Sequence, residues 1–239
     1  MSDLAWLSRT ELLLGKAKLE NLQKAHVLVV GLGGVGSFAA EFLCRAGIGN
    51  MTIVDGDIVE PSNRNRQLPA LATTLGQHKA DVMADRLLSI NPDLELSVIK
   101  EFISPEGARQ ILQHDFDHIV EAIDNISTKI TFLQTAYLKG AALISSMGAG
   151  GKLDPTQIRV VDIAKTYNCP FAQNVRRRLK ELAIRKGIKT VFSPENPIEA
   201  SLQLADGEKV KRSIYGTISY LPAAFGGVCA SVVIRDLTN

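Results

Sequence analysis

A run of apolar residues that ends in a glycine-rich turn constrains this chain more than any other feature. Residues 27–30 read Val-Leu-Val-Val, and four glycines follow at once: Gly31, Gly33, Gly34 and Gly36. The apolar run is typical of a buried strand, and the glycines allow a tight turn and a close backbone approach to a phosphate. A helix beginning directly afterwards would present unpaired N–H groups to that anion. The pattern predicts a nucleotide pocket at the end of a strand.

A second cluster narrows the choice of nucleotide. Asp55 follows the next apolar strand, residues 51–54, where an acid commonly accepts a ribose hydroxyl, and Asp57 is either a turn residue or a contact to nucleotide or metal. Amides and cations then gather at Asn63, Arg64, Asn65, Arg66, Gln67 and Lys79. The glycine pattern alone would suit NAD, FAD, S-adenosylmethionine or ATP. A departing pyrophosphate needs more positive charge than NAD does, so this cluster favours ATP cleavage.

Strand and helix patterns alternate along most of the chain. The expected strands are residues 27–30, 51–54, 94–99, 118–122, 142–146, 157–162 and 190–192. The expected helices are residues 35–46, 79–90, 105–113, 128–139, 172–186 and 220–237. A long loop is expected at 193–212, which contains Pro194, Pro197, Asp206-Gly207 and mixed charges. This order predicts an α/β, Rossmann-like, doubly wound fold whose mainly parallel sheet is extended by later antiparallel strands. We divide it into a helical arm (1–24), an ATP-binding domain (25–150) and a C-terminal extension of that domain (151–239).

Net charge, cysteine content and the length of the apolar stretches indicate the cellular compartment and argue against several classes of protein. With 239 residues and a net charge of +2, the chain has no global attraction for nucleic acid. Its three cysteines, Cys44, Cys169 and Cys229, form no Cys-x-x-Cys pair, which argues against a disulfide scaffold or a zinc ribbon and fits a reducing cytoplasm. No signal-peptide pattern is present, and the apolar stretch 223–234 is shorter than the roughly 20 residues that span a bilayer, so no membrane association is expected.

The motifs together resemble the ThiF/MoeB adenylating enzymes, which are related to ubiquitin activators. The resemblance is carried by Gly31-x-Gly33-Gly34-x-Gly36, Asp55-x-Asp57, Asn63-x-x-Arg66-Gln67, Gly76-x-x-Lys79-Ala80, Asn91-Pro92 and Asp124-Asn125. Within that superfamily the second half is most similar to the tRNA threonylcarbamoyladenosine dehydratases, through residues 148–158, residues 162–166, the Val191-Phe192-Ser193 segment and Glu195.

The resemblance implies roles for individual residues. Asp124 follows the strand 118–122 and should lie at the ligand edge of the sheet, where it would hold Mg²⁺; alternatively it only caps the helix that begins near Ser127. Arg66 and Lys79 would clamp the triphosphate; alternatively they are ordinary surface cations. Arg9 would cross from the partner subunit of a homodimer. The nucleotide would contact Gly31, Gly33, Gly34, Gly36, Asp55, Asp57, Asn63, Arg66, Gln67, Lys79 and Asp124.

The implied reaction is a ligase-like adenylation. The carboxylate of the threonylcarbamoyl group on a tRNA adenosine would attack the α-phosphate of ATP, after which the group closes a ring with loss of AMP. The main alternative is activation of a sulfur-carrier protein with a diglycine tail, although relatives of that kind commonly keep two Cys-x-x-Cys zinc pairs. A nicotinamide oxidoreductase or a nucleotide-sensing module would leave the Asn/Arg/Gln cluster and Asp124 without a task.

Three further features remain open at the level of sequence. A basic run, comprising Arg176, Arg177, Arg178, Lys180, Arg185, Lys186 and Lys189, is either a solvated helix face or a supply of phosphate contacts for tRNA. Cys169 lacks a neighbouring histidine and is not expected to be a nucleophile. The resemblance leaves open whether a monovalent cation orders residues 148–151 and whether a sulfur-acceptor protein assists.

Overall fold

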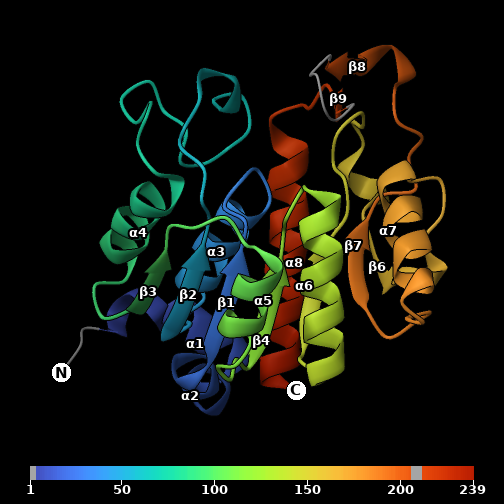
Figure 1. Cartoon of the computed structure of the whole chain (residues 1–239). Helices are drawn as coiled ribbons and strands as arrows, with labels where there is room; N and C mark the ends of the chain where they lie inside the picture. The colour runs from blue at the N-terminus through green and yellow to red at the C-terminus, as the bar shows by residue number, and fades with distance from the viewer. Residues whose placement is uncertain (1–3, 206–211) are drawn as a thin grey trace.

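A computed structural model describes residues 4–205 and 212–239 and contains a seven-stranded sheet (Figure 1). The strands are β1 (His26–Val30), β2 (Asn50–Val54), β3 (Glu95–Ile99), β4 (His118–Glu121), β5 (Leu143–Ser146), β6 (Arg159–Asp162) and β7 (Lys189–Phe192). Their order is β3-β2-β1-β4-β5-β7-β6, and all neighbours pair in parallel except β6, which pairs antiparallel with β7 at the edge. The predicted α/β fold is therefore confirmed.

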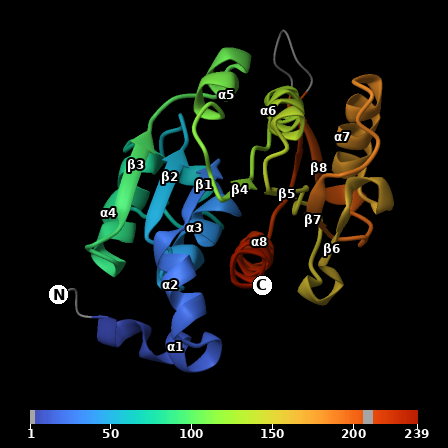
Figure 2. The same ribbon diagram turned by 90° about the horizontal axis from the view of Figure 1, so that it is seen from below.

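Helices cover both faces of this sheet (Figure 2). They are α1 (Ser8–Leu14), α2 (Lys16–Lys24), α3 (Gly36–Arg45), α4 (Lys79–Ile90), α5 (Pro105–Ile111), α6 (Ile126–Lys139), α7 (Pro170–Glu181) and α8 (Tyr220–Thr238). Helices α3, α4 and α8 share one core with the sheet, and α5, α6 and α7 share the other. Because crossover helices bury both faces, the central strands β1 and β2 are buried along most of their length and mainly apolar rather than alternating.

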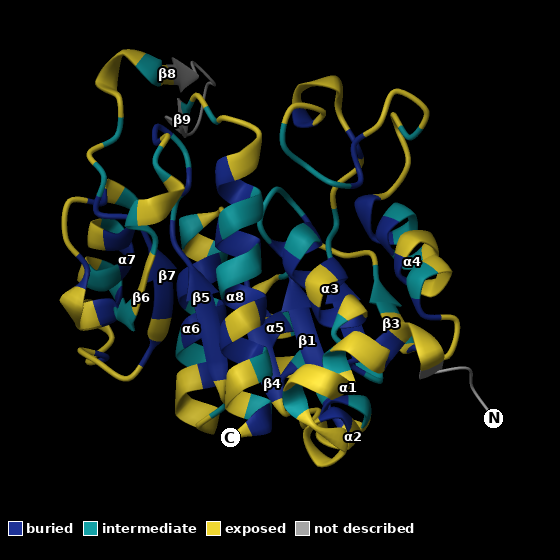
Figure 3. Ribbon diagram, turned by 180° about the vertical axis from the view of Figure 1, so that it is seen from behind, coloured by how far each residue is buried: buried dark blue, intermediate teal, exposed yellow. Residues whose placement is uncertain are grey.

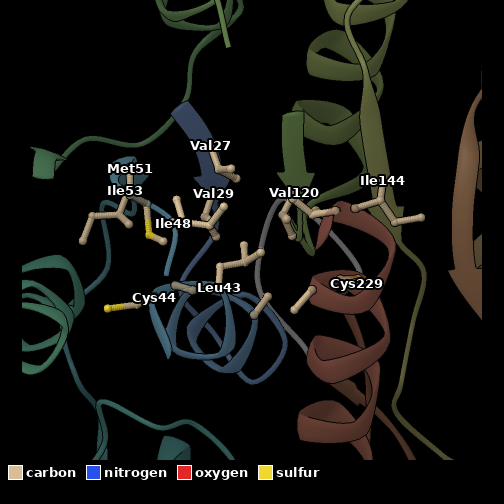
Figure 4. Close-up of a cluster of buried hydrophobic side chains, with 14 of the residues drawn as sticks. Val27, Val29, Leu43, Cys44, Ile48, Met51, Ile53, Val120, Ile144 and Cys229 are labelled. Atoms are coloured by element: carbon tan, nitrogen blue, oxygen red, sulfur yellow. The ribbon is translucent and has the colours of Figure 1, made fainter. Parts of the chain in front are cut away.

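The four apolar side chains of β1, residues 27–30, enter the two cores alternately. Val27 and Val29 point toward α3 and α8, as Figure 4 shows, while Leu28 and Val30 belong to the core under α5 and α6. Cys44 of α3 lies in the first of these cores, so its sulfur fills apolar space. This double burial holds β1 rigidly, and with it the glycine turn that β1 carries.

Helix α8, the last element of the chain, covers the middle of one face of the sheet (Figure 3). Its 19 residues are long and apolar enough to cross a membrane by length and composition, but half of that stretch is buried inside the protein. Leu221, Phe225, Cys229 and Val233 lie against the sheet and α3. The apolar character of α8 is thus explained by its place in the core of this fold.

Two expectations about local structure are wrong. The helix expected at 172–186 ends at Glu181, because Ala183 takes a left-handed φ of 63° and turns Ile184 into the core. The segment expected to be a loop at 193–212 contains the strands β8 (Leu202–Ala205) and β9 (Arg212–Tyr215), which form an antiparallel hairpin. Residues 206–211 of the expected loop, including Asp206-Gly207, lie outside the described residues. The arm at 4–24 is helical as expected, but Gly15 at φ 84° divides it into α1 and α2.

Candidate nucleotide site

The glycine turn lies where the strand order reverses, between β1 and β4. Ligands of doubly wound sheets bind at such a point, outside the carboxyl ends of the strands. Gly31 has a φ of 86°, and a Cβ added to it would meet the Ala122 carbonyl oxygen at 2.8 Å. A Cβ on Gly36 would lie 1.7 Å from the Gly31 oxygen. These two glycines are therefore required by close packing of the loop upon itself and upon the end of β4.

Asp55 braces the loop from the end of β2. Its Oδ2 accepts a hydrogen bond from the Leu32 N–H at 2.5 Å, and its Oδ1 accepts one from the Asp57 N–H at 2.8 Å. Burial raises the pKa of this carboxyl, while the two backbone donors and the Lys79 ammonium act in the opposite direction. Asp55 thus joins the ends of β1 and β2 and presents an acceptor at the ligand edge of the sheet.

Lys79 is a fixed cation rather than a mobile surface lysine. Only 4% of it is exposed, and its Nζ lies 2.8 Å from Asp57 Oδ2. The Lys79 N–H also donates to the Asp57 carbonyl oxygen, so the start of α4 is tied to the loop after β2. Asp57 therefore positions Lys79, and its half-exposed carboxylate remains within reach of a ligand.

Arg66 and Gln67 lie beside the glycine turn. The Arg66 carbonyl oxygen is 3.3 Å from an ideal Cβ on Gly34, and Gln67 Nε2 is 3.8 Å from one on Gly33. Arg66 Nη1 donates to Ser62 O and to Asn65 Oδ1, which leaves its other nitrogens available. The Oε1 atom of Gln67 is buried and has no partner among the described residues. An unsatisfied acceptor next to a phosphate loop marks a position that awaits a donor.

Asn63 has a different local task. Its side-chain oxygen accepts from the Glu60 N–H at 3.1 Å and completes the turn Pro61–Asn63. The residue is buried, and its amide nitrogen lies 3.5 Å from the Ser62 hydroxyl. In this arrangement Asn63 shapes the segment that carries Arg66.

Asp124 lies in the loop between β4 and α6 with its side chain exposed. The cap of α6 is Asn125, whose side chain accepts from the Thr128 N–H at 3.1 Å, so the capping alternative for Asp124 is not realised. Within residues 4–205 and 212–239, Asp124 has no hydrogen-bonding or ion-pair partner. Mg²⁺ is commonly held by one or two carboxylates together with phosphate oxygens, and a single unpaired carboxylate at the edge of the sheet that carries the glycine turn fits that donor set.

Arg9 lies far from this edge of its own chain. It is exposed on α1, next to Leu7, whose side chain packs against Gly47 near the amino end of β2. Figure 1 shows α1 and α2 at the opposite end of the strands from the glycine turn. Arg9 therefore cannot reach the nucleotide site of the same chain.

The basic run of α7 does not form one surface. Arg176 donates to Thr166, Arg178 Nη1 donates to the Ser127 hydroxyl at 3.1 Å, and Arg177 is exposed. Lys189 is paired with Asp236. Arg176 thus holds the crossover in place, whereas Arg178 reaches the start of α6, three residues beyond Asp124.

Several contacts around the site escaped sequence reasoning. A Cβ on Gly56 would lie 2.5 Å from the Phe102 N, so the loop after β3 packs directly on the loop after β2. Asn65 Nδ2 donates to Thr217 O at 2.8 Å, which ties the Arg66 segment to the chain before α8. Tyr215 of β9 lies over Gly150. Each of these contacts joins segments that are far apart in the sequence, so no local sequence pattern predicts it.

The turn at 148–151 is ordered by groups of the chain itself. Gly151 N donates to Gly216 O at 2.8 Å, and Gly151 O accepts from the Ile198 N–H at 2.7 Å. Beside it, the buried Lys152 donates to the Ser193 carbonyl oxygen at 2.6 Å. The Lys152 ammonium therefore already supplies a fixed positive charge next to this turn.

Comparison with known proteins agrees with this geometry. A model of the ThiF family matches residues 7–239. The tRNA threonylcarbamoyladenosine dehydratase of Bacillus subtilis (strain 168) is 39% identical over 237 residues, covering 96% of this chain and 93% of that protein. The protein of the same name from Escherichia coli (strain K12) is 36% identical over 253 residues, covering 98% and 94%. The crystal structure of E. coli tRNA N6-threonylcarbamoyladenosine dehydratase, TcdA, in complex with ATP has a TM-score of 0.90 at 35% identity, covering 99% and 96%. The predicted resemblance is confirmed: this chain belongs to the ThiF family.

Proposed function

We propose that this protein is an ATP-dependent tRNA threonylcarbamoyladenosine dehydratase. The observation that carries the proposal is the meeting, at one edge of the sheet, of the glycine turn, the fixed cation Lys79 and the unpaired carboxylate of Asp124. That set suits a triphosphate whose pyrophosphate leaves. Similarity along nearly the whole chain to dehydratases, one of them solved with ATP, supports the choice of substrate.

The reaction needs no protein nucleophile. A carboxylate oxygen of the threonylcarbamoyl group forms a bond to the α-phosphorus of ATP, and the bond from that phosphorus to the pyrophosphate oxygen breaks. The resulting acyl-adenylate is then attacked at its acyl carbon by a nitrogen or oxygen of the same modified group. The ring closes, AMP leaves, and one water equivalent has been removed at the expense of ATP.

The side chains supply position and charge. Asp55 accepts a ribose hydroxyl, the glycine turn and the start of α3 receive phosphate, and Lys79 and Arg66 stabilise the charge that develops on the departing pyrophosphate. Asp124 would hold Mg²⁺, which when bound neutralises phosphate charge. Arg66 is suited to this task because its guanidinium is anchored at one nitrogen and free at the others.

A homodimer completes the site in this proposal. The arm exposes two apolar side chains, Leu12 at 84% and Leu13 at 83%, on the same short helix as Arg9. A second copy of the chain would cover these leucines and carry Arg9 to the partner's triphosphate, in the manner of an arginine finger. The arm (1–24) would then serve assembly, while 25–150 and 151–239 form one adenylating unit around the shared sheet. We assign this assembly to the cytoplasm, where its unpaired cysteines stay reduced.

Nucleoside mass spectrometry tests the function. Purified protein, ATP, Mg²⁺ and tRNA bearing threonylcarbamoyladenosine should yield a nucleoside lighter by one water, with AMP and pyrophosphate in equal amounts. Asp124→Asn and Arg66→Ala should each lower turnover about 100-fold or more, because each removes a charge that acts on the triphosphate. Arg109→Ala, which removes an exposed arginine paired with Glu106, is the matched control and should retain turnover. Absence of the dehydrated nucleoside, or hydride transfer to a nicotinamide cofactor, contradicts the proposal.

A further inference from the structure

A fully buried ion pair lies behind the nucleotide site. Glu121, the last residue of β4, and Lys129 of α6 are both 0% exposed, and Lys129 Nζ lies 2.7 Å and 2.5 Å from the two carboxylate oxygens. Ser145 of β5 donates its hydroxyl to Glu121 Oε2 at 2.5 Å. Desolvating two charges is costly, and an apolar pair of similar volume is often at least as stable. The stability of the core therefore does not explain why charges are kept here.

Glu121 holds the backbone that carries Asp124. Its Oε1 atom accepts a hydrogen bond from the Ile123 N–H at 2.8 Å. The preceding residue, Ala122, donates its own N–H to Val30 O, and the following helix is capped by Asn125. Asp124 thus lies between two fixed points, and the bond from the Ile123 N–H to Glu121 fixes the Ala122–Ile123 peptide group, one residue before Asp124.

Lys129 connects the same pair to the other side of the site. Its Nζ lies 5.8 Å from the centre of the Phe171 ring, at the start of α7. The Cβ atom of Phe171 is 3.1 Å from an ideal Cβ on Gly148, so the ring fills the space beside the turn at 148–151. A cation over an aromatic face is attractive in a water-free interior. The ion pair therefore contacts both the backbone before Asp124, through Ile123, and the ring of Phe171 beside the turn at 148–151.

We propose that Glu121, itself held by Lys129, is a positioning residue: its bond to the Ile123 N–H fixes the loop so that the Asp124 carboxylate stays directed at the triphosphate and its metal. Glu121 accomplishes this through its bond to Ile123, and Lys129 orients the Glu121 carboxylate by donating hydrogen bonds to both of its oxygens. Neither side chain touches the nucleotide. The inference rests on the proposed function of Asp124.

Two double variants separate the Ile123 bond from the charges. Glu121→Gln combined with Lys129→Met removes both charges and keeps an acceptor for Ile123. Glu121→Leu combined with Lys129→Met removes both charges and the acceptor. Both replace the pair by uncharged side chains of similar size, so neither leaves a buried charge without a partner. Glu41→Gln is the control, because Glu41 is a nearly buried carboxylate held by Arg45 and Arg86 between α3 and α4.

Two measurements are made on each protein. The rate of amide hydrogen exchange at Ile123 reports the strength of its hydrogen bond to Glu121. Calorimetry of ATP binding gives the Mg²⁺ concentration that binding requires, which should rise if the Asp124 carboxylate is misdirected. The leucine double variant should exchange Ile123 about tenfold faster and need about tenfold more Mg²⁺, since the buried Ile123 N–H loses the acceptor that the glutamine double variant retains. The glutamine double variant should stay within about threefold of the wild type in both, and Glu41→Gln should change only the melting temperature.

The outcomes distinguish this inference from the proposed function. If the leucine double variant matches the wild type in exchange and in Mg²⁺ dependence, or if both double variants change equally, the positioning role is refuted. If the wild type binds ATP in a Mg²⁺-dependent manner but makes no dehydrated nucleoside, the proposed function fails while the positioning role is still tested by these two measurements.

Discussion

Two positions of the glycine turn require glycine for different reasons: Gly36 because the fold leaves no room for a side chain, and Gly33 because a phosphate must approach. Single alanine substitutions should distinguish these two reasons. A Cβ on Gly36 would lie 1.7 Å from the Gly31 carbonyl oxygen, closer than any real contact. A Cβ on Gly33 would meet only Gln67 Nε2, at an ordinary 3.8 Å. Gly36→Ala should therefore damage the fold, whereas Gly33→Ala should leave the fold intact and obstruct only the approach of phosphate.

The cost of Gly36→Ala follows from the size of the overlap. The neighbouring atom belongs to the backbone, and the backbone must shift by more than an ångström to accept the methyl group. Overpacking of this kind costs about 1–3 kcal/mol, and a rigid backbone neighbour places this case near the upper end. For a chain of this size each kcal/mol lowers the melting temperature by about 2–4 °C, so we expect a fall of about 6–12 °C.

Thermal unfolding and calorimetry of ATP binding together provide the assay. Gly33→Ala should melt within about 2 °C of the wild type, as a substitution costing less than about 0.5 kcal/mol would, yet bind ATP more weakly. Gly36→Ala should lose stability and ATP affinity together. A Gly36→Ala protein with the wild-type melting temperature, or a Gly33→Ala protein with wild-type ATP affinity, would refute the reasoning from close approach.

Three other predictions follow from burial and placement. Burial raises the pKa of Asp55, so the contribution of this carboxyl to folding stability is greatest at low pH and is lost as the pH rises through that pKa. The affinity for ATP should show the opposite trend and fall as the pH drops through the same pKa. Calorimetric titrations of Asp55→Asn at the same pH values should show no such fall. Burial raises the pKa of Cys44 to about 11 and that of Cys229 to about 12, so a thiolate-selective reagent should label these residues only on unfolding, and rapid labelling of the native protein would contradict their placement. Inactive Arg9→Ala and Asp124→Ala chains, once mixed, should recover activity in up to about half of the sites of each heterodimer; an active monomeric wild type would exclude Arg9 acting between subunits.

The sequence predicts the central sheet well because that sheet depends on local patterns. Strands β1 and β2 are short apolar runs bounded by glycine or aspartate, and α4 begins at Lys79 and ends at Ile90 as expected. The end of α7 was missed because its basic residues continue past the last helical turn. What stops the helix is the burial of Ile184, a tertiary effect that helix propensity does not contain.

The missed supports of the site have a physical reason in common. Among the described residues, β8 and β9 pair only with each other, and Tyr215 of β9 packs over Gly150. These strands therefore lack the pattern of a strand buried on both faces. The pair of Glu121 and Lys129 did leave a signal in the sequence: a charged residue stands in the apolar run of β4, and another occupies the buried stripe of α6. A charged residue at a core position is expected to have a partner of opposite charge. Only the fold shows that Glu121 and Lys129 form an ion pair with each other.

The place of α8 has a consequence for the order of events during synthesis. This helix follows every strand along the chain, yet Pro222 lies against Gly34, and Gly226 leaves no room for a Cβ beside the Val35 carbonyl oxygen. A nascent chain that ends before Pro222 has all seven strands of the main sheet but lacks the surface on which its phosphate loop is shaped. Such contacts between distant segments slow folding and leave an apolar sheet face uncovered in the meantime. We therefore expect the chain to bind nucleotide only after α8 has been synthesised and has docked on the sheet.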